Sequence, residues 1–304
     1  MLSCKDASRG GRWFYCKRCD RYEFVPFGCN SRLCSCCGKR YTDQWASMLA
    51  ERLEKNIFHR HLVFGIPDML WKYFQEDRTL YKILMDTAYK TIKETFSKIN
   101  HREVTPGVIE VYHPFGRDIK HQPHVHMIVT EGGYDKQGKF VSSGNYIPFN
   151  ALHKNWEYNI LKALRKRLPF GIVEIAYRRY PNGFCVYVRE DRISSRKGLA
   201  KYIGRYVRHP AIANTRIVNY NGEAVKFYWK DHEDNIHFKI MLVYDFISAI
   251  IQHVPEKNQK LVRYYGAYSR RKKAGIKSST TSLLPLEITQ NRIAYCSKCH
   301  ESME

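Results

Sequence analysis

Short runs of alternating apolar and polar residues predict β-strands, and one such run carries two histidines. It extends from Pro123 to Val129 and is followed by the pair Gly132–Gly133, as is typical of a strand that stops at a turn. Successive strand residues point to opposite faces of a sheet. The core face is therefore expected to carry Val125, Met127 and Val129, and the other face His124, His126 and Ile128.

A second strand is predicted over Val108–His113, directly before the histidine strand. The turn Phe115–Asp118 leads the chain back, so the two strands are expected to pair antiparallel. This pairing brings either Glu110 or His113 close to the two imidazoles. Strand alternation cannot choose between them, because the register and any bulge are unknown from sequence.

A helical pattern occupies residues 197–210. At about 100° per residue, Leu199, Ile203 and Val207 fall on one face of the helix. Three cationic residues fall on roughly the opposite face: Lys201, Arg205 and Arg208. Tyr202 and Tyr206 stand one turn apart at the border between the two faces. Tyrosines at this spacing are most often packing residues, but next to a histidine strand and a cationic face they are candidates for chemistry.

The remaining patterns predict an α+β fold with an antiparallel sheet. Helices are expected over residues 42–56, with Thr42 or Asp43 as N-cap, twice between residues 67 and 100, and over residues 148–168 and 246–253, where Asp245 is the expected cap. Strands are expected over residues 59–66, 172–178, 184–189, 214–219, 224–229, 237–244 and 261–268. The turns at Pro181–Gly183 and Asn221–Gly222 predict two of these strand pairs to be hairpins.

Charge narrows the range of partners. The chain of 304 residues has 51 Lys and Arg against 29 Asp and Glu, for a net charge of +22, and its 22 Tyr, 15 Phe and 5 Trp lie among these cations. Cations replace the counterions of phosphates, and aromatic rings stack on unpaired bases, so nucleic acid is the expected partner. No run has membrane-spanning length and the start has no apolar signal segment, which favours an intracellular protein without a membrane partner.

The ten cysteines predict a zinc site near the N-terminus. Cys16-x2-Cys19 and Cys34-x2-Cys37, separated by fourteen residues, have the spacing of a four-thiolate zinc knuckle. Cys29 and Cys36 leave open an exchange of ligands within the second pair. Cations and aromatic residues surround the motif, so we expect this module to bind DNA, through residues that include Arg18, Arg32, Lys39 and Arg40.

Two histidines on one strand face also predict a metal site. Adjacent imidazoles can converge on a single divalent ion. His124 and His126 are the candidate ligands, and His113 or Glu110 is the candidate third ligand.

The order of these motifs resembles that of a known group of transposases. The two CxxC pairs, the segment His61–Pro67, Phe115-Gly116 leading to Pro123-His124-Val125-His126, and the helix Tyr202–Tyr206 follow one another as in the IS91 group of HUH (His-hydrophobe-His) single-strand DNA transposases. The similarity extends from about residue 12 to Gly266. The resemblance implies a zinc-binding N-terminal domain and an HUH nuclease domain, whose antiparallel sheet carries the histidines and whose flanking helix presents the tyrosines.

The resemblance also implies roles for these residues. His124 and His126 match the metal ligands of the family, and His or Gln stands at the position of His113, which favours His113 over Glu110. Tyr206 matches the tyrosine retained in single-tyrosine relatives, and Tyr202 the additional one of two-tyrosine relatives. The implied reaction nicks and rejoins single-stranded DNA through a 5′-phosphotyrosine, with catalytic Mg²⁺ or Mn²⁺ in addition to structural Zn²⁺.

The expected organisation is a zinc-binding domain over residues 1–45, a nuclease domain over residues 46–275 and a tail over residues 276–304. Cys296 and Cys299 in the tail could form half of a metal site, completed by Cys4, Cys185 or another subunit, or be vestigial. A plasmid or phage rolling-circle replication initiator has the same chemistry, and a non-catalytic, zinc-dependent nucleic-acid binding protein is the third hypothesis. For the first hypothesis, a transposase, the expected location is the cytoplasm of a prokaryote, in association with the nucleoid.

Overall fold

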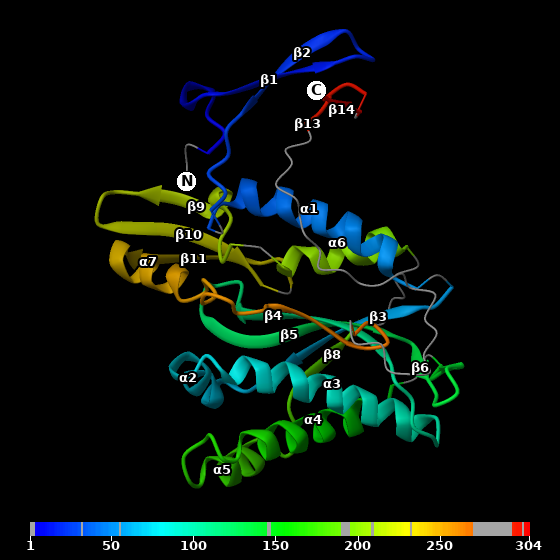
Figure 1. Cartoon of the computed structure of the whole chain (residues 1–304). Coiled ribbons are helices and arrows are strands. Elements are labelled where there is room, and N and C mark those ends of the chain that lie inside the picture. The colour runs from blue at the N-terminus through cyan, green and yellow to red at the C-terminus, as the bar shows by residue number, and fades with distance from the viewer. Residues whose placement is uncertain are drawn as a thin grey trace.

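The computed structural model describes residues 4–31, 33–54, 56–144, 147–189, 195–207, 210–231, 233–269, 294–299 and 301–304 (Figure 1). The helices are α1 (Ser35–Arg52), α2 (Asp68–Glu76), α3 (Leu80–Ile99), α4 (Phe149–Leu164), α5 (Ile172–Arg179), α6 (Arg196–Val207) and α7 (Val243–Ile251). The strands are β1 (Gly11–Cys16), β2 (Arg21–Pro26), β3 (His59–Gly65), β4 (Gly107–Phe115), β5 (His121–Thr130), β6 (Gly132–Tyr134), β7 (Phe140–Ser142), β8 (Val186–Val188), β9 (Ile217–Tyr220), β10 (Ala224–Lys230), β11 (Ile236–Leu242), β12 (Val262–Gly266), β13 (Ala294–Tyr295) and β14 (Ser302–Met303).

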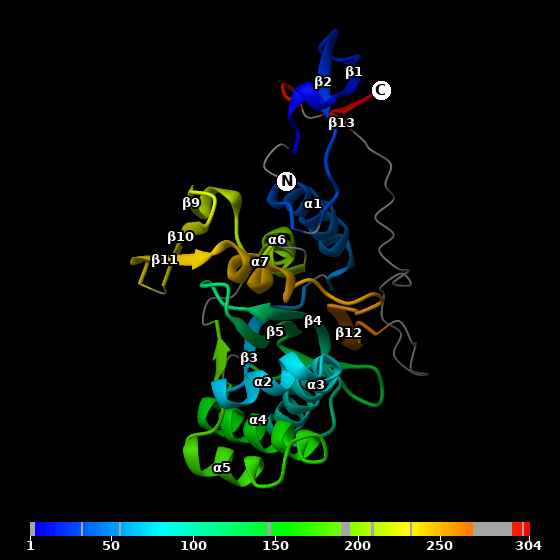
Figure 2. The ribbon, with the colours of Figure 1, turned by 90° about the vertical axis from the view of Figure 1, so that its left-hand side faces the viewer.

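A five-stranded antiparallel sheet in the order β12-β4-β5-β3-β8 forms the middle layer of the molecule. On one face, Leu62, Phe64 and Met127 pack with the buried side chains of α2, α3 and α4. On the other face, Ile109 and Ile128 pack with α1 and α6. Both views show the sheet between these two sets of helices (Figures 1 and 2). The expected mixed fold of helices and antiparallel strands is confirmed.

The two helices on the second face approach each other closely. Gly204 of α6 lies against α1, where a Cβ atom would be only 3.1 Å from Cγ2 of Thr42 and 3.4 Å from Cβ of Ala46. α1 begins at Ser35, seven residues earlier than expected, so Thr42 lies inside the helix and is not its N-cap. The helix also continues through residue 45, where the sequence predicts a domain boundary.

Among the described residues, four smaller sheets accompany this layer: β9–β11, β1–β2, β13–β14 and β6–β7. Strands β9 and β10 form the hairpin expected around Asn221–Gly222, and β11 adds a third strand to it, with α7 against this sheet. α7 begins at Val243, which places Asp245 in the first turn instead of at the cap. Strands β1 and β2 form a separate hairpin next to β13 and β14 of the C-terminal tail (Figure 1). The sequence also has four consecutive cationic residues at positions 270–273, which lie outside the described residues.

The prediction of a strand over residues 172–178 is wrong, because this segment forms helix α5. Gly171 precedes it with a φ of 81°, a left-handed conformation that suits glycine. Val173 and Ala176, three residues apart, are the buried side chains of α5, which is the spacing of one helix face. The dense apolar residues of this run obscured the helical period.

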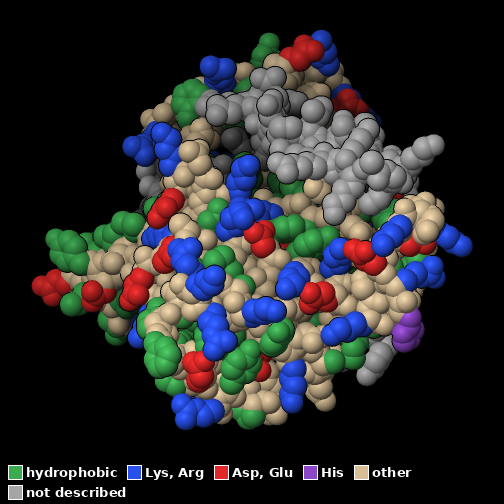
Figure 3. Space-filling model, turned by 60° about the horizontal axis from the view of Figure 1, so that its bottom comes forward, with side chains coloured by type: hydrophobic (Ala, Val, Ile, Leu, Met, Phe, Trp, Pro, Cys, Tyr) green, Lys and Arg blue, Asp and Glu red, His purple; other side chains and the backbone are tan. Residues whose placement is uncertain are grey.

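Lys and Arg side chains are scattered over the face shown in Figure 3, among acidic and hydrophobic side chains, and do not gather in one patch there. Within the described part of the chain, no helix is both long enough and apolar enough to cross a membrane.

Glu110 is a buried carboxylate on the face of the sheet that packs with α3. Its side chain is fully buried, and among the described residues neither of its carboxylate oxygens has a hydrogen-bond partner. Burial raises the pKa of Glu110 well above its usual range, with Asp86 acting in the same direction and Arg263 against it. Glu110 therefore destabilises the fold at any pH at which the unfolded chain carries this charge.

We expect Glu110→Gln to stabilise the protein at pH 8 by about 1 to 3 kcal/mol. At this pH the folded wild type must keep the buried carboxyl of Glu110 protonated, whereas a glutamine amide is neutral in both the folded and the unfolded state. Above the unfolded pKa, the unfolded state gives up that proton more readily than the folded state, so wild-type stability falls as the pH rises towards the raised folded pKa. The gain should shrink as the pH approaches 4.5. Thermal unfolding at pH 5 and pH 8 measures it.

The matched control is Glu76→Gln, because Glu76 is an exposed carboxylate on α2. It should change the unfolding temperature little at either pH. A Glu110→Gln protein that is less stable than wild type to the same extent at both pH values would contradict the assignment of a buried, unfavourable charge.

Candidate functional site

Three histidines meet on the face of the sheet that packs with α1 and α6. His113 and His124 are direct partners in the β4–β5 register, and His126 follows on the same face of β5. Nδ1 of His113 is 3.1 Å from Nε2 of His124, which is 3.2 Å from Nε2 of His126. The three nitrogen atoms thus form a compact cluster that could hold one metal ion.

The other ring nitrogens fix how these imidazoles point. Nδ1 of His124 is 2.7 Å from the carbonyl oxygen of Gln122, to which it donates, so Nε2 carries the lone pair that faces the cluster. Nδ1 of His126 is 3.0 Å from Nε2 of His61 on β3. Such contacts by the second nitrogen orient metal-ligating histidines in proteins, and the donor set therefore fits a divalent ion with open coordination positions.

His61 was not predicted as a site residue. It is buried, and its ring stacks with that of His126 at a centroid distance of 5.3 Å. The available signal in the sequence was a histidine within a largely apolar predicted strand. Strand alternation places His61 on the same face of this strand as Val63. Sequence alone could not show that this face of β3 is adjacent to His126.

The protein environment keeps His124 and His126 neutral. Loss of solvation lowers the pKa of His124 to about 4. The pKa of His126 is lowered well below its usual range by burial and, secondarily, by His124, His113 and His61. A neutral imidazole is the form that binds a metal, so these residues need not lose a proton to do so near pH 7.

Two tyrosines of α6 lie directly against the histidines. The ring of Tyr206 stacks on that of His126 with the centroids 3.5 Å apart, and the ring of Tyr202 meets that of His61 edge-on at 4.8 Å. Burial, with hydrogen bonding to Tyr202, raises the pKa of Tyr206 above its ordinary value, whereas Arg205 and Arg117 act in the opposite direction. The phenol of Tyr206 is thus protonated in the metal-free protein.

Strand alternation places Glu110 outside this cluster. His113 and Val111 share the face of His124 and His126, whereas Glu110 points to the opposite face, towards Asp86 and Arg263. Of the two residues considered as the third ligand, only His113 has the required position.

Two grooves border the tyrosines. One is lined by His113, Tyr206 and Leu33, among other residues. The other is lined by Tyr202, Arg189, Tyr187 and Phe149, and the last two of these are substantially exposed. The guanidinium groups of Arg189 and Arg205 lie 5.2 and 5.6 Å from the ring centroid of Tyr202.

The cations predicted to bind DNA have different environments. Lys201, Arg205 and Lys39 are exposed. Arg18 is paired with Glu301 of the tail, with Nη1 2.7 Å from Oε1. Arg32 and Arg208 lie outside the described residues, as does the side chain of Arg40.

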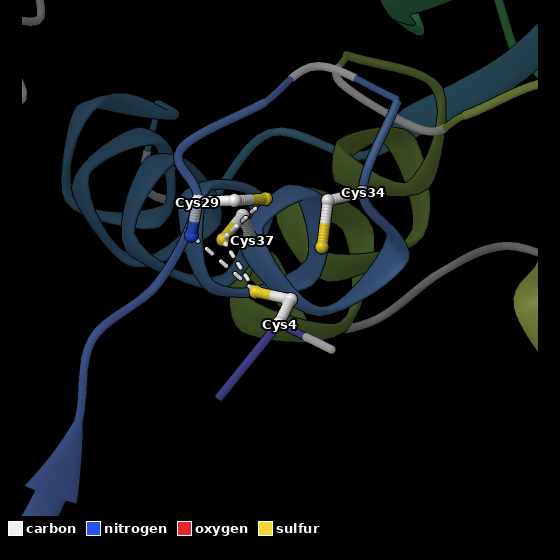
Figure 4. A group of neighbouring side chains, drawn as sticks. All are labelled: Cys4, Cys29, Cys34 and Cys37. Atoms are coloured by element: carbon white, nitrogen blue, oxygen red, sulfur yellow. Dashed lines mark hydrogen bonds between the residues drawn. The ribbon is translucent and has the colours of Figure 1, made fainter. Parts of the chain in front are cut away.

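The cysteines form two clusters, not the single predicted knuckle. Cys34 and Cys37 of the α1 N-terminus meet Cys4 and Cys29, and the four sulfur atoms point towards one another (Figure 4). Cys16 and Cys19 instead meet Cys296 and Cys299 of the tail. The prediction of one site made of Cys16, Cys19, Cys34 and Cys37 is therefore wrong, because each CxxC pair finds its partners elsewhere in the chain.

The sulfur atoms are spaced for metal binding. Sγ of Cys37 is 3.6 Å from Sγ of Cys4 and 3.9 Å from Sγ of Cys29. Four thiolates around one zinc ion, each about 2.3 Å from it, lie about 3.8 Å apart. All ten cysteines are free thiols, and Cys36 and Cys185 are exposed.

Comparison with known proteins agrees with this arrangement. A family model described as a putative transposase matches residues 107–275, and one described as a transposase zinc-binding domain matches residues 1–66. The transposase for insertion sequence element IS801 of Pseudomonas savastanoi pv. phaseolicola is 28% identical over 290 residues, which cover 89% of this chain and 69% of the relative. The putative transposase y4qJ of Sinorhizobium fredii is 27% identical over 290 residues, covering 88% and 72%. No solved structure matches significantly.

The first family model alone spans more than half of the chain and includes the candidate histidines and tyrosines. The zinc-binding model covers Cys4, Cys29, Cys34 and Cys37, which accounts for a zinc-binding region at the N-terminus. Transposases bind DNA, cleave it and transfer its strands. The chain belongs to this transposase family and, with its zinc-binding domain, is a rolling-circle transposase of the IS91 type.

Proposed function

We propose that this transposase moves its insertion sequence by nicking and rejoining single-stranded DNA, with Tyr206 as the first nucleophile. The observation that carries the proposal is the stacking of Tyr206 on His126, 3.5 Å between ring centroids, at the edge of the three-histidine cluster. A nucleophile and a metal site in contact are the arrangement that phosphoryl transfer requires. This combination corresponds to the HUH type of nuclease.

In this proposal His113, His124 and His126 hold a Mg²⁺ or Mn²⁺ ion, which would polarise the scissile phosphate and offset the charge of the transition state. His61 acts as a positioning residue, because its contact with Nδ1 of His126 keeps Nε2 directed at the cluster. Glu110 takes no part.

Tyr206 has to lose its proton to attack. Arg205 and Arg117 favour the phenolate, whereas burial and Tyr202 oppose it. The phenolic oxygen forms a bond to phosphorus, and the bond from phosphorus to the 3′-oxygen of the preceding nucleotide breaks. The products are a 5′-phosphotyrosine and a 3′-hydroxyl, which takes up the proton. One phosphodiester replaces another, so the step is reversible and needs no nucleotide hydrolysis.

Tyr202 is placed to serve a second strand transfer. It lies one helical turn before Tyr206, with the ring centroids 5.9 Å apart, and it lines the groove with Arg189 and Tyr187. Aromatic rings and cations along a groove bind unpaired strands through stacking and phosphate contacts. The grooves on the two sides of the tyrosine pair are therefore the proposed path of the strand.

We expect Tyr206→Phe to abolish the covalent protein–DNA adduct, by at least about a thousandfold, because the nucleophilic oxygen is removed. Tyr202→Phe should still form the first adduct. Single-stranded oligonucleotides that carry the ends of the element, incubated with Mn²⁺ or Mg²⁺, measure both variants in a denaturing gel. Tyr187→Phe is the matched control, since it changes an exposed phenol in the same groove.

The opposite pattern, an adduct lost in Tyr202→Phe and kept in Tyr206→Phe, would exchange the two roles. If the wild type binds the oligonucleotides tightly but forms no adduct, the catalytic proposal is wrong and a zinc-dependent DNA-binding protein is left.

Metal binding tests the cluster without reference to cleavage. His126→Ala should abolish Mn²⁺ binding measured by electron paramagnetic resonance, because one of three ligands is lost. Glu110→Gln should bind Mn²⁺ as the wild type does, since Glu110 points to the other face of the sheet. His61→Ala should weaken binding by about 10-fold to 100-fold, the usual effect of losing a contact that orients a ligand.

Equal affinity in His126→Ala and wild type would show that the three histidines do not form the site. Equal affinity in His61→Ala and wild type would remove the positioning role alone.

A further inference from the structure

The cluster formed by Cys16, Cys19, Cys296 and Cys299 joins the two ends of the chain. Sγ of Cys16 is 3.5 Å from Sγ of Cys299, although 283 positions separate them in sequence. The metal-ligating atoms of the four residues lie within 4.8 Å of one another, and Cys16 and Cys296 are buried. A tetrahedral zinc site requires such spacing, with sulfur atoms about 3.8 Å apart.

Each half of this cluster has the same local structure. Cys16 ends β1 and Cys19 lies in the turn before β2. Cys296 follows β13, and Cys299 lies in the turn before β14, with the amide of Cys296 donating to the carbonyl oxygen of Glu301. Two short hairpins thus face each other through CxxC turns, the arrangement of a zinc ribbon.

The tail is also attached by contacts that do not involve sulfur. The amide of Tyr15 donates to the carbonyl oxygen of Glu304 at 2.7 Å, and the amide of Glu304 donates to the carbonyl oxygen of Tyr15 at 3.1 Å. The end of the tail is thus hydrogen-bonded to the backbone of β1. The carboxylate of Glu23 accepts from the amide and the hydroxyl of Ser297. Lys17 pairs with Glu304.

The apolar side chains of the β1–β2 hairpin that pack against the tail lie on one face of the hairpin. Phe14, Cys16 and Val25 pack towards the tail. The opposite face carries two cross-strand aromatic pairs, Trp13 with Phe24 and Tyr15 with Tyr22. Trp13 and Tyr22 are 66% and 68% exposed. The tail therefore covers the cysteine face and leaves the aromatic face open.

We propose that Cys16, Cys19, Cys296 and Cys299 bind a second zinc ion, separate from the ion of the Cys4 cluster, and that this ion fastens the C-terminal tail to the N-terminal hairpin. The site is of the four-thiolate structural class. It does not depend on the proposed nuclease chemistry, since none of its residues contacts the histidine cluster.

Zinc stoichiometry of the full chain, measured by native mass spectrometry, tests this proposal. The wild type should carry two zinc ions. Cys296→Ser with Cys299→Ser should carry one, and Cys29→Ser with Cys34→Ser should also carry one. Cys36→Ser and Cys185→Ser are matched controls that should keep two, because both residues are exposed and outside the clusters. Cys299→His should also keep two, because an imidazole can replace a thiolate at zinc.

One zinc ion in the wild type, or two in the tail double variant, would overturn the proposal. If that double variant loses both ions by misfolding, a Co²⁺ titration of the wild-type apoprotein decides the matter. Two equivalents, each with thiolate-to-cobalt absorption, support two sites, and saturation after one equivalent excludes the second.

Discussion

The antiparallel pairing of β4 with β5 is the constraint on which the candidate active site depends. Its register sets His113 opposite His124, and the two-residue period of β5 brings His126 to the same face. A slip of one residue would turn His113 to the other face of the sheet and bring Glu110 to the face that carries His124 and His126. The register is held from both directions, because Val125 and Met127 are buried against one layer of helices and Ile128 against the other.

The second face of the sheet carries the rest of the site. α6 presents Tyr206 to the histidines only because its apolar side, including Leu199 and Ile203, packs against the sheet and α1. Gly204 permits the close approach of the two helices. The same α1 has Cys34 as its N-cap and holds Cys37 in its first turn, so the cysteine cluster and the tyrosine helix share one support.

The residue spacing within single strands and helices was enough to predict much of this candidate site. The faces of His124 and His126 and the border position of Tyr202 and Tyr206 follow from spacing along single elements. Sequence could not choose between His113 and Glu110, because that choice depends on pairing between strands. It also assigned the cysteines wrongly, since a CxxC pair shows where two ligands are but not which distant pair completes them. Cys16 and Cys19 meet partners near the C-terminus, and His61 meets His126 from a separate strand.

The position of Leu33 has a consequence for how far this transposase is modular. Leu33 immediately precedes Cys34, and its side chain lines the same groove as Tyr206 and His113. The cysteine-rich region therefore supplies part of the wall beside the proposed nucleophile. Exchange of this region between relatives, in evolution or in the laboratory, would alter this wall of the groove as well as the cysteine cluster. In a functional chimaera, α1 and α6 would have to come from the same parent protein.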